Sequence, residues 1–171
     1  GAKVVDIVVG PVVTRFELEI EEGTSVKRVE QYSKDITMGL ESPSEVIIQA
    51  PIPGKNRFGV EVPNKKRTKV MMRDLVESDI FTNHKSSVVF ALGKDVAGKM
   101  MYCDIKKMPH LLVAGSTGTG KSVCLNTILI SILYHSSPED VRIILVDPKR
   151  VEFNVYSGLP HLLINELIND S

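Results

Sequence analysis

The stretch HLLVAGSTGTGKSVCLNTILISILYH, residues 110–135, decides what kind of domain this protein contains. Its apolar start predicts a strand, its end predicts a long helix, and a loop with three glycines joins them. The loop, Gly115 to Ser122, satisfies the pattern G-x-x-x-x-G-K-[ST], which binds phosphate where it connects a strand to a helix. A glycine-rich turn that matches by chance is the alternative. Because both flanking elements are in register with the pattern, we predict a nucleotide-binding P-loop.

The residue types in this loop suit the phosphates of a nucleotide. Glycines let the backbone turn its N–H groups inward, and the N-terminus of a helix favours an anion. We expect Lys121 to contact the β- and γ-phosphates and the Ser122 hydroxyl to bind Mg²⁺. The sequence has no N-K-x-D guanine-recognition motif, which favours ATP over GTP. The predicted nucleotide-binding residues are Gly115, Ser116, Thr117, Gly118, Thr119, Gly120, Lys121, Ser122 and Val123.

A second apolar run, VRIILVD, ends at Asp147. This carboxylate resembles the magnesium-supporting residue of a Walker B strand, so Asp147 joins Lys121 and Ser122 as a candidate catalytic residue. It would either support Mg²⁺ or sense the nucleotide from a neighbouring strand. The alternative is a structural aspartate that caps the turn before Pro148. No second strand ending in Asp-Glu follows in the sequence, so we expect this chain to hydrolyse ATP poorly.

The sequence before the P-loop follows a different pattern. Residues 4–9 and 13–20 are β-branched runs broken at Gly10-Pro11, which predicts an antiparallel pair. In the second run Phe16 and Leu18 alternate with glutamates, as in a strand with one wet face. A helix capped by Thr24 or Ser25, two more strands and the short helix VMMRDLVES follow.

The predicted fold class is therefore α/β. A small α+β module covers residues 1–76, and an α/β nucleotide-binding domain with a mainly parallel sheet begins at residue 77. Apolar runs without alternation indicate strands that are covered on both faces, as in parallel sheets. HKSSVVFALGKDVAGKMMYCDI, residues 84–105, predicts a hairpin that turns near Asp95.

Composition limits the possible functions without choosing one. Lys and Arg number 21 and Asp and Glu number 21, so the net charge is zero, which argues mildly against a dedicated nucleic-acid-binding protein. The two cysteines lack metal-ligand spacing and indicate a reducing compartment. No apolar run reaches the roughly 18 residues of a membrane span.

Residues 109–163 closely resemble the FtsK/SpoIIIE family of bacterial double-stranded DNA translocases. The segment DPKRVEFNVYSGLPHLL, residues 147–163, is far more specific than the P-loop. GPVVTRFELEIEEG, APIPGKNRFGVEVPN and the adjoining KKR resemble the α module that precedes the family's RecA-like ATPase core. Ile47 departs from the arginine common in relatives, and Pro43 interrupts the segment before it. The family's Walker B strand, the rest of its core, its winged-helix module and its membrane-spanning part have no counterpart in this sequence.

The resemblance implies an α module followed by the start of a RecA-like P-loop domain. The parent protein would be a ring, expected to be a hexamer, that encircles double-stranded DNA and moves chromosomal DNA during cell division or sporulation. Its motor portion would be cytoplasmic, with the membrane reached only through other parts of the parent. A neighbouring subunit would supply an arginine to the γ-phosphate. Arg150 is the candidate for that role, with a structural or solvent-exposed arginine as the alternative.

Basic residues are candidates for contact with DNA phosphates. Lys65, Lys66 and Arg67 form the densest cluster, and Lys106-Lys107 and Lys149-Arg150 are pairs. Such clusters are most often solvated loops, and a DNA channel would bind through them without regard to sequence.

Two other functions fit the same residues. One is a related P-loop motor with a protein or conjugation substrate. The other is a non-catalytic module that binds nucleotide and mediates assembly. Stimulation of ATP turnover by duplex DNA would distinguish the DNA translocase from both.

Overall fold

The computed structural model describes residues 2–20, 29–42, 44–116, 118–148 and 152–164. The chain divides into two compact units. Unit 1 comprises residues 1–70 and 94–99, and unit 2 comprises residues 71–93 and 100–171. Helix α3 (Met72–Val76) lies in unit 2, whereas the sequence prediction places it at the end of the first module.

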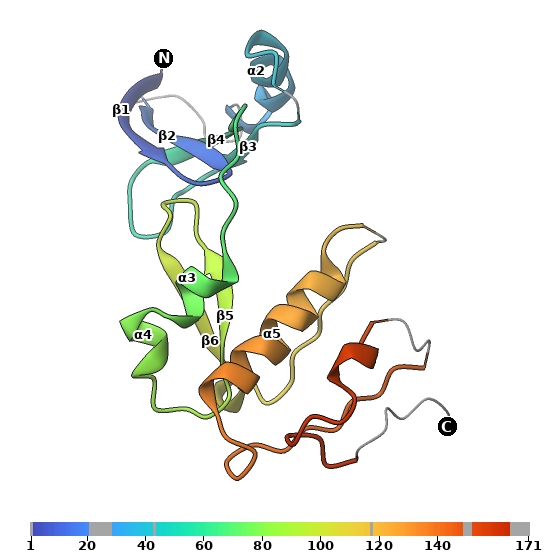
Figure 1. The fold of residues 1–171 in the computed structure, drawn as a ribbon. Coiled ribbons are helices and arrows are strands. Elements are labelled where there is room, and N and C mark those ends of the chain that lie inside the picture. The colour runs from blue at the N-terminus through green and yellow to red at the C-terminus, as the bar shows by residue number, and fades with distance from the viewer. Residues whose placement is uncertain (1, 21–28, 43, 117, 149–151, 165–171) are drawn as a thin grey trace. The chain divides into compact units, whose positions relative to one another are not determined.

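Unit 1 is built on a four-stranded antiparallel sheet (Figure 1). The strands are β1 (Ala2–Val9), β2 (Val13–Ile20), β3 (Ile47–Gln49) and β4 (Phe58–Pro63), in the order β1-β2-β4-β3. The hairpin predicted at Gly10-Pro11 is confirmed, with the Gly10 N–H donating to the carbonyl of Val13 at 2.9 Å. The predicted caps Thr24 and Ser25 lie outside the described residues. Of the helix predicted after them, residues 29–30 are helical, a turn follows at residues 31–32, and α2 (Ser33–Gly39) forms beyond that turn.

The core of unit 1 forms where the sheet meets α2. Val46, Phe58 and Val60 are buried, and Phe16, Leu18 and Ile36 are among the partly buried side chains packed against them. The alternation in β2 therefore predicts correctly which of its residues face this core. The stabilisation is hydrophobic, because these side chains leave water when the sheet and helix meet.

The opposite face of β2 is not wet at Glu17, contrary to the alternation. The Glu17 side chain is 0% exposed, and the segment between β3 and β4 provides its partners. Lys55 Nζ lies 2.7 Å from Oε1, and Arg57 Nη1 lies 3.4 Å from Oε2. The hydrogen bond from Lys55 lowers the pKa of Glu17 although burial opposes it. A period of two identifies a strand face but not the loop that later covers it.

Unit 2 contains a two-stranded hairpin with helices packed on β5. The strands are β5 (Val89–Lys94) and β6 (Met100–Asp104), and the helices are α3, α4 (Asp79–Thr82) and α5 (Lys121–His135). Val89 packs with Val76 and Phe81 from α3 and α4, whereas Phe90 packs with Ile128 and Ile132 from α5. Successive side chains of a strand point to opposite faces, so β5 lies between the two groups of helices (Figure 1).

Helix α5 is also joined to β5 by a buried polar contact. Ser131 is 0% exposed; its Oγ accepts from the Ala91 N–H at 3.0 Å and donates to the Thr127 carbonyl at 2.7 Å. The buried hydroxyl therefore both donates and accepts a hydrogen bond, so its burial leaves no polar group unsatisfied. This serine fixes the position of the helix that follows the P-loop against the hairpin.

Two predicted strands are not formed. Residues 110–114 and 141–147 have no named strand, and an isolated parallel bridge joins Ile143 to Leu162. Leu112 is 91% exposed and Ile144 is 53% exposed. A strand exists only through pairing, and the described residues supply no neighbouring strands for these runs. The predicted parallel sheet is thus not confirmed; the structure is a mixed α/β fold with small sheets.

The remaining described elements are short. The 3₁₀ helices η1 (Ile105–Lys107) and η2 (Asn154–Tyr156) follow β6 and the segment after Asp147, respectively. Within the described ranges, no helix has the length and apolar character needed to cross a membrane.

Candidate functional site

The P-loop ends in the first turn of α5, and its backbone has the conformation that glycine allows. Gly118 has φ +83° and Gly120 has φ +96°, a region that side chains with a Cβ rarely adopt. Gly120 is the N-cap of α5, and no side chain among the described residues caps this helix end. The Cys124 N–H donates to the Gly120 carbonyl at 2.9 Å. The N–H groups of the first turn of α5, which come before Cys124, have no acceptor within the helix. A bound anion can therefore accept hydrogen bonds from them.

A hollow of about 390 Å³ lies over this helix end, within the range of small-molecule sites. The described residues that line it are Gly115, Ser116, Gly118, Gly120, Lys121, Ser122, Val123 and Glu152. Lys121 is exposed and Ser122 is half-buried. The structure therefore brings the cation and the hydroxyl of the motif to one hollow, together with the amides of the helix end. Thr117 lies outside the described residues, and Thr119 donates its hydroxyl to the Ser116 carbonyl at 2.7 Å.

Glu152 is the residue of this hollow that the sequence analysis missed. Its Oε1 accepts a hydrogen bond from Ser122 Oγ at 2.8 Å, although the two residues are far apart in sequence. The carboxylate lies on the segment after the second apolar run. A Walker B carboxylate is expected at the end of a strand, so that pattern does not identify Glu152. The short spacing between Asp147 and Glu152 is the signal that could have drawn attention to it.

Asp147 makes structural contacts with the segment that follows it, whereas the alternative to catalysis was a cap of the turn before Pro148. It is 5% exposed, and its Oδ2 accepts from the N–H of Glu152 at 3.0 Å and from the N–H of Phe153 at 3.2 Å. It therefore organises the backbone that carries Glu152. Among the described lining residues, Glu152 and not Asp147 borders the hollow. A direct role of Asp147 toward Mg²⁺ stays a prediction.

The segment with Glu152 is also tied to α5 one turn further along the helix. The Tyr156 hydroxyl donates to Asn126 Oδ1, and Asn126 Nδ2 donates to the Ser122 carbonyl at 2.8 Å. Tyr156 is buried, which raises its pKa and keeps its hydroxyl protonated as a donor. Two contacts, one from Ser122 and one from Asn126, thus hold the segment against the first turns of the helix.

Comparison with known families assigns both parts of the chain. The sequence profile of the FtsK/SpoIIIE family matches residues 71–171, and that of the FtsK alpha domain matches residues 1–64. The chain belongs to the FtsK/SpoIIIE family. The resemblance on which the sequence analysis relied is thus confirmed.

Individual members of the FtsK/SpoIIIE family align with almost the whole chain. The DNA translocase FtsK of Caldanaerobacter subterraneus subsp. tengcongensis is 51% identical over 95% of this chain, and that of Clostridium acetobutylicum is 50% identical over 98%. The DNA translocase SftA of Bacillus subtilis is 46% identical over 99%. The aligned part is 23%, 22% and 18% of these three proteins, so the chain spans about a fifth of their length.

A solved structure of a conjugation coupling protein also aligns. The pCW3 protein TcpA, in its monomer form with ATPγS, is 20% identical with a TM-score of 0.38, covering 99% of this chain and 44% of that one. This likeness is too remote to bear on the fold.

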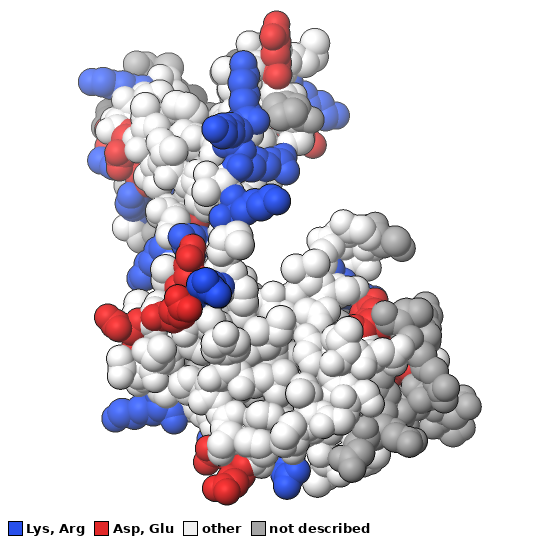
Figure 2. Space-filling model, viewed as in Figure 1, with Lys and Arg blue, Asp and Glu red and all other residues white. Residues whose placement is uncertain are grey.

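The basic candidates for DNA contact within this family member are at the surface. Lys65, Lys66 and Arg67 are all exposed in the segment after β4 of unit 1. On the face shown in Figure 2, several Lys and Arg side chains lie together on unit 1, whereas most of the described surface of unit 2 carries no charge. Lys149 and Arg150 lie outside the described residues, so the predicted arginine role stays a prediction.

Lys106 and Lys107 border an open hollow in unit 2. Asp104 and His84 also line it, so the site combines cations with a carboxylate. The hydrogen bond from the Ser86 hydroxyl is the main cause that lowers the pKa of Asp104, which keeps the carboxylate charged. That negative charge weakens the attraction of this hollow for phosphate.

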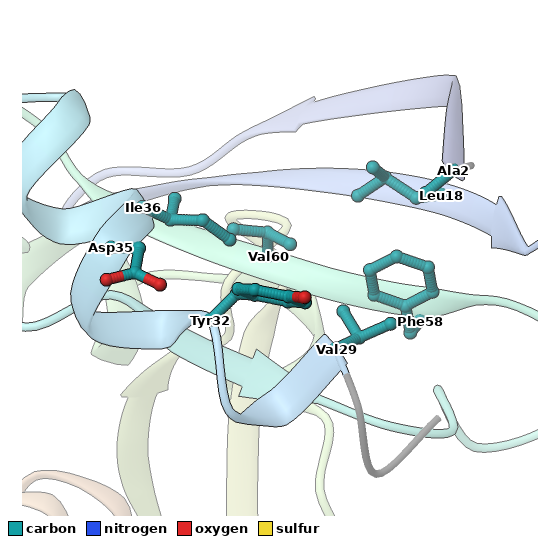
Figure 3. Close-up of a pocket in the computed structure, with 8 residues that line it drawn as sticks. All are labelled: Ala2, Leu18, Val29, Tyr32, Asp35, Ile36, Phe58 and Val60. Atoms are coloured by element: carbon teal, nitrogen blue, oxygen red, sulfur yellow. The ribbon is translucent and has the colours of Figure 1, made fainter. Parts of the chain in front are cut away.

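A third hollow belongs to unit 1 and is apolar. Figure 3 shows Tyr32 and Ile36 on one side and Leu18, Phe58 and Val60 on the other, with the Asp35 carboxylate at the edge. The described residues that line it include no cation for a phosphate group. Within the part of the chain that the structure describes, no cluster of three or more potential metal ligands is found either. The P-loop hollow is therefore the best candidate for nucleotide.

Proposed function

We propose that this chain carries the nucleotide-binding part of an ATP-driven motor that moves double-stranded DNA. Two findings support the proposal. The chain belongs to the FtsK/SpoIIIE family, and its P-loop motif brings Lys121, Ser122 and the N-terminus of α5 to one hollow. The second observation carries most weight, because a helix end with N–H groups and a lysine beside it suits a polyphosphate.

The residues of the hollow fit ATP with Mg²⁺. The first-turn amides of α5 would hold the phosphates, and Lys121 would neutralise charge on the β- and γ-phosphates. Ser122 presents a hydroxyl oxygen, the type of ligand that Mg²⁺ takes in such sites. When bound, Mg²⁺ supplies positive charge that stabilises the transferring phosphoryl group. The chain by itself is expected to bind ATP or ADP weakly and to turn ATP over poorly.

The two apolar runs that flank α5 would form the parallel sheet of a RecA-like domain in the complete motor. Residues 110–114 and 141–147 are mainly apolar segments on either side of the P-loop helix, and strands of parallel sheets have this composition. We propose a domain division near residue 76, with an α module before it and the ATPase domain after it.

Assembly and DNA binding belong to the complete protein in this proposal. A ring, expected to be a hexamer, would place one nucleotide site at each subunit interface and would surround duplex DNA. A ring repeats any local cluster of cations, so the zero net charge of the chain is compatible with a DNA channel. A membrane anchor would lie in other parts of the parent protein.

The deciding experiment is ATP turnover by the parent protein with no DNA, with single-stranded DNA and with long duplex DNA. We expect strong stimulation by duplex DNA alone, and Lys121→Ala in the parent should remove it. Turnover without any response to DNA would contradict the DNA motor and favour a protein-moving relative. Ring formation without DNA-dependent turnover would favour a non-catalytic assembly module.

A further inference from the structure

The carboxylate of Glu152 contacts the P-loop at Ser122, whose hydroxyl is expected to bind the metal. Ser122 Oγ donates to Glu152 Oε1 at 2.8 Å, and Glu152 lines the same hollow as Lys121. Nothing in the motif itself requires a partner at this hydroxyl. The contact comes from a distant segment whose backbone is held in place by Asp147.

We propose that Glu152 positions the Ser122 hydroxyl toward the Mg²⁺ that accompanies the nucleotide, an inference that rests on the proposed function. A serine hydroxyl has one proton and two lone pairs. When its proton is donated to Glu152, its lone pairs are directed elsewhere, which leaves them for the metal. Groups that hydrogen-bond to metal ligands in this way fix the orientation of the ligand and raise its basicity.

The charge of Glu152 adds to this effect. A hydrogen bond to a carboxylate is roughly twice as strong as one between neutral groups, so the orientation of Ser122 is well defined. Mg²⁺ also keeps several water ligands in most protein sites, and such waters donate to nearby carboxylates. Glu152 therefore favours the metal-bound nucleotide over the metal-free one, because its negative charge repels bare phosphates.

The surrounding contacts hold Glu152 in this position. Asp147 accepts from the N–H groups of Glu152 and Phe153, and Tyr156 ties the same segment to Asn126 on α5. Asp147 thus acts on the site through the backbone of Glu152. This arrangement assigns a purpose to a buried aspartate that does not itself line the hollow.

The test is equilibrium binding of ATP, measured with Mg²⁺ and again with EDTA. It compares the unsubstituted chain with its Glu152→Gln and Glu152→Ala variants. The quantity of interest is the gain in affinity that Mg²⁺ brings. Loss of a partner to a metal ligand typically costs about 10–100-fold in metal affinity, so we expect Glu152→Ala to reduce this gain at least about tenfold. Glutamine still accepts a hydrogen bond, so Glu152→Gln should reduce it less. In EDTA both variants should bind ATP as tightly as the unsubstituted chain does, or more tightly.

The matched control is Glu139→Gln, which removes an exposed carboxylate of unit 2 that does not line the hollow. It should leave binding unchanged in both conditions, and unchanged circular dichroism should show that each variant is folded. An unaltered Mg²⁺ gain in Glu152→Ala would overturn the inference while leaving the proposed function intact. Tighter Mg-ATP binding in Glu152→Gln would also overturn it, because Glu152 would then compete with the metal. If the unsubstituted chain bound no ATP in either condition, that result would contradict the proposed function itself.

Discussion

The sheet of unit 1 and the segments around the P-loop in unit 2 are held in different ways. In unit 1 every named strand pairs with a neighbour, and the inner strands β2 and β4 each have partners on both sides. Around the P-loop, α5 is packed on the hairpin. The apolar run before α5 stays largely exposed, whereas Val141 and Ile143 of the run after it pack against the core formed by Phe90 and α5. The side-chain contacts of Asp147, Glu152 and Tyr156 hold the second of these runs near the site.

The difference follows from how the two kinds of sheet are made. Antiparallel strands pair through short turns, so a hairpin such as β1–β2 carries its own partner. Parallel strands need a crossover and further strands beside them, so an isolated apolar run has nothing to pair with. A nucleotide site built at such runs then depends on side chains to keep its geometry. The predictions below separate the two regions by changing one at a time.

The largest effect is expected at Lys121. Lys121→Ala removes the cation beside the phosphates, and hydrogen bonds to charged groups contribute about 1.5–3 kcal/mol each, so two lost contacts raise the Kd for Mg-ATP at least about 100-fold. Titration calorimetry measures the change. Thermal unfolding should stay as in the parent, because Lys121 is exposed. Normal affinity in this variant would remove the phosphate-binding argument.

The next effect concerns the buried charge of unit 1. Glu17→Ala leaves Lys55 and Arg57 without their carboxylate partner. Because both side chains are partly exposed, water can solvate their charges in the variant. We therefore expect a loss of about 1–3 kcal/mol in the free energy of unfolding, less than for a fully buried pair. ATP binding should not change. A variant that also lost ATP binding would show that the two regions are not independent.

A comparable effect is expected where α5 meets β5. Ser131→Ala leaves the buried N–H of Ala91 without an acceptor, at a cost of about 1–3 kcal/mol. For a chain of this size each 1 kcal/mol lowers Tm by about 2–4 °C. Thr127→Ala is the matched control, since the Thr127 hydroxyl donates to the Val123 carbonyl in the same helix and so does not tie the helix to the hairpin. Equal losses in both variants would contradict a specific role for Ser131.

A smaller effect separates the two readings of Asp147. Asp147→Ala removes the acceptor for two backbone N–H groups, and loss of a capping side chain costs about 0.5–2 kcal/mol. Asp147→Asn keeps an acceptor oxygen and should retain most of this stability and the Mg²⁺ gain in ATP affinity. Hydrogen exchange of the Glu152 and Phe153 amides reports the local loss. If Asp147→Asn abolished the Mg²⁺ gain while both amides stayed protected, a direct metal role would replace the structural one.

The smallest effect is a pH dependence in unit 1. Lys55 lowers the pKa of Glu17 in the folded protein below its usual 4.5. The stabilisation is therefore fully present above pH 4.5 and is lost as the pH falls through the lower, folded-state pKa. Urea unfolding between pH 6 and pH 3 should show this loss in the parent. Glu17→Gln should not show this loss of stability at acid pH. If the stability of Glu17→Gln fell with pH as that of the unsubstituted chain does, the role assigned to Glu17 would be contradicted.

Sequence patterns predict the local elements well. The β1–β2 hairpin, the hairpin at residues 89–104 and α5 all form where the patterns place them, because each depends on neighbouring residues. The core positions Phe16 and Leu18 were predictable from alternation for the same reason. Glu17 was not, because its burial depends on Lys55 and Arg57 from another segment.

The candidate site divides in the same way. Its P-loop residues are contiguous and match a known motif, whereas Glu152 reaches Ser122 only through the fold of the segment after Asp147. The strands expected at 110–114 and 141–147 have the right composition, but composition cannot supply neighbouring strands. Contacts between distant segments are thus the part that the sequence alone did not predict.

Hydrogen exchange with and without Mg-ATP tests the central claim most directly. The account predicts slower exchange in the first turn of α5, at Lys121, Ser122 and Val123, together with Glu152, and no change in the sheet of unit 1. Lys121→Ala should abolish the protection. Protection that appeared elsewhere, or that persisted in Lys121→Ala, would contradict the P-loop hollow as the nucleotide site.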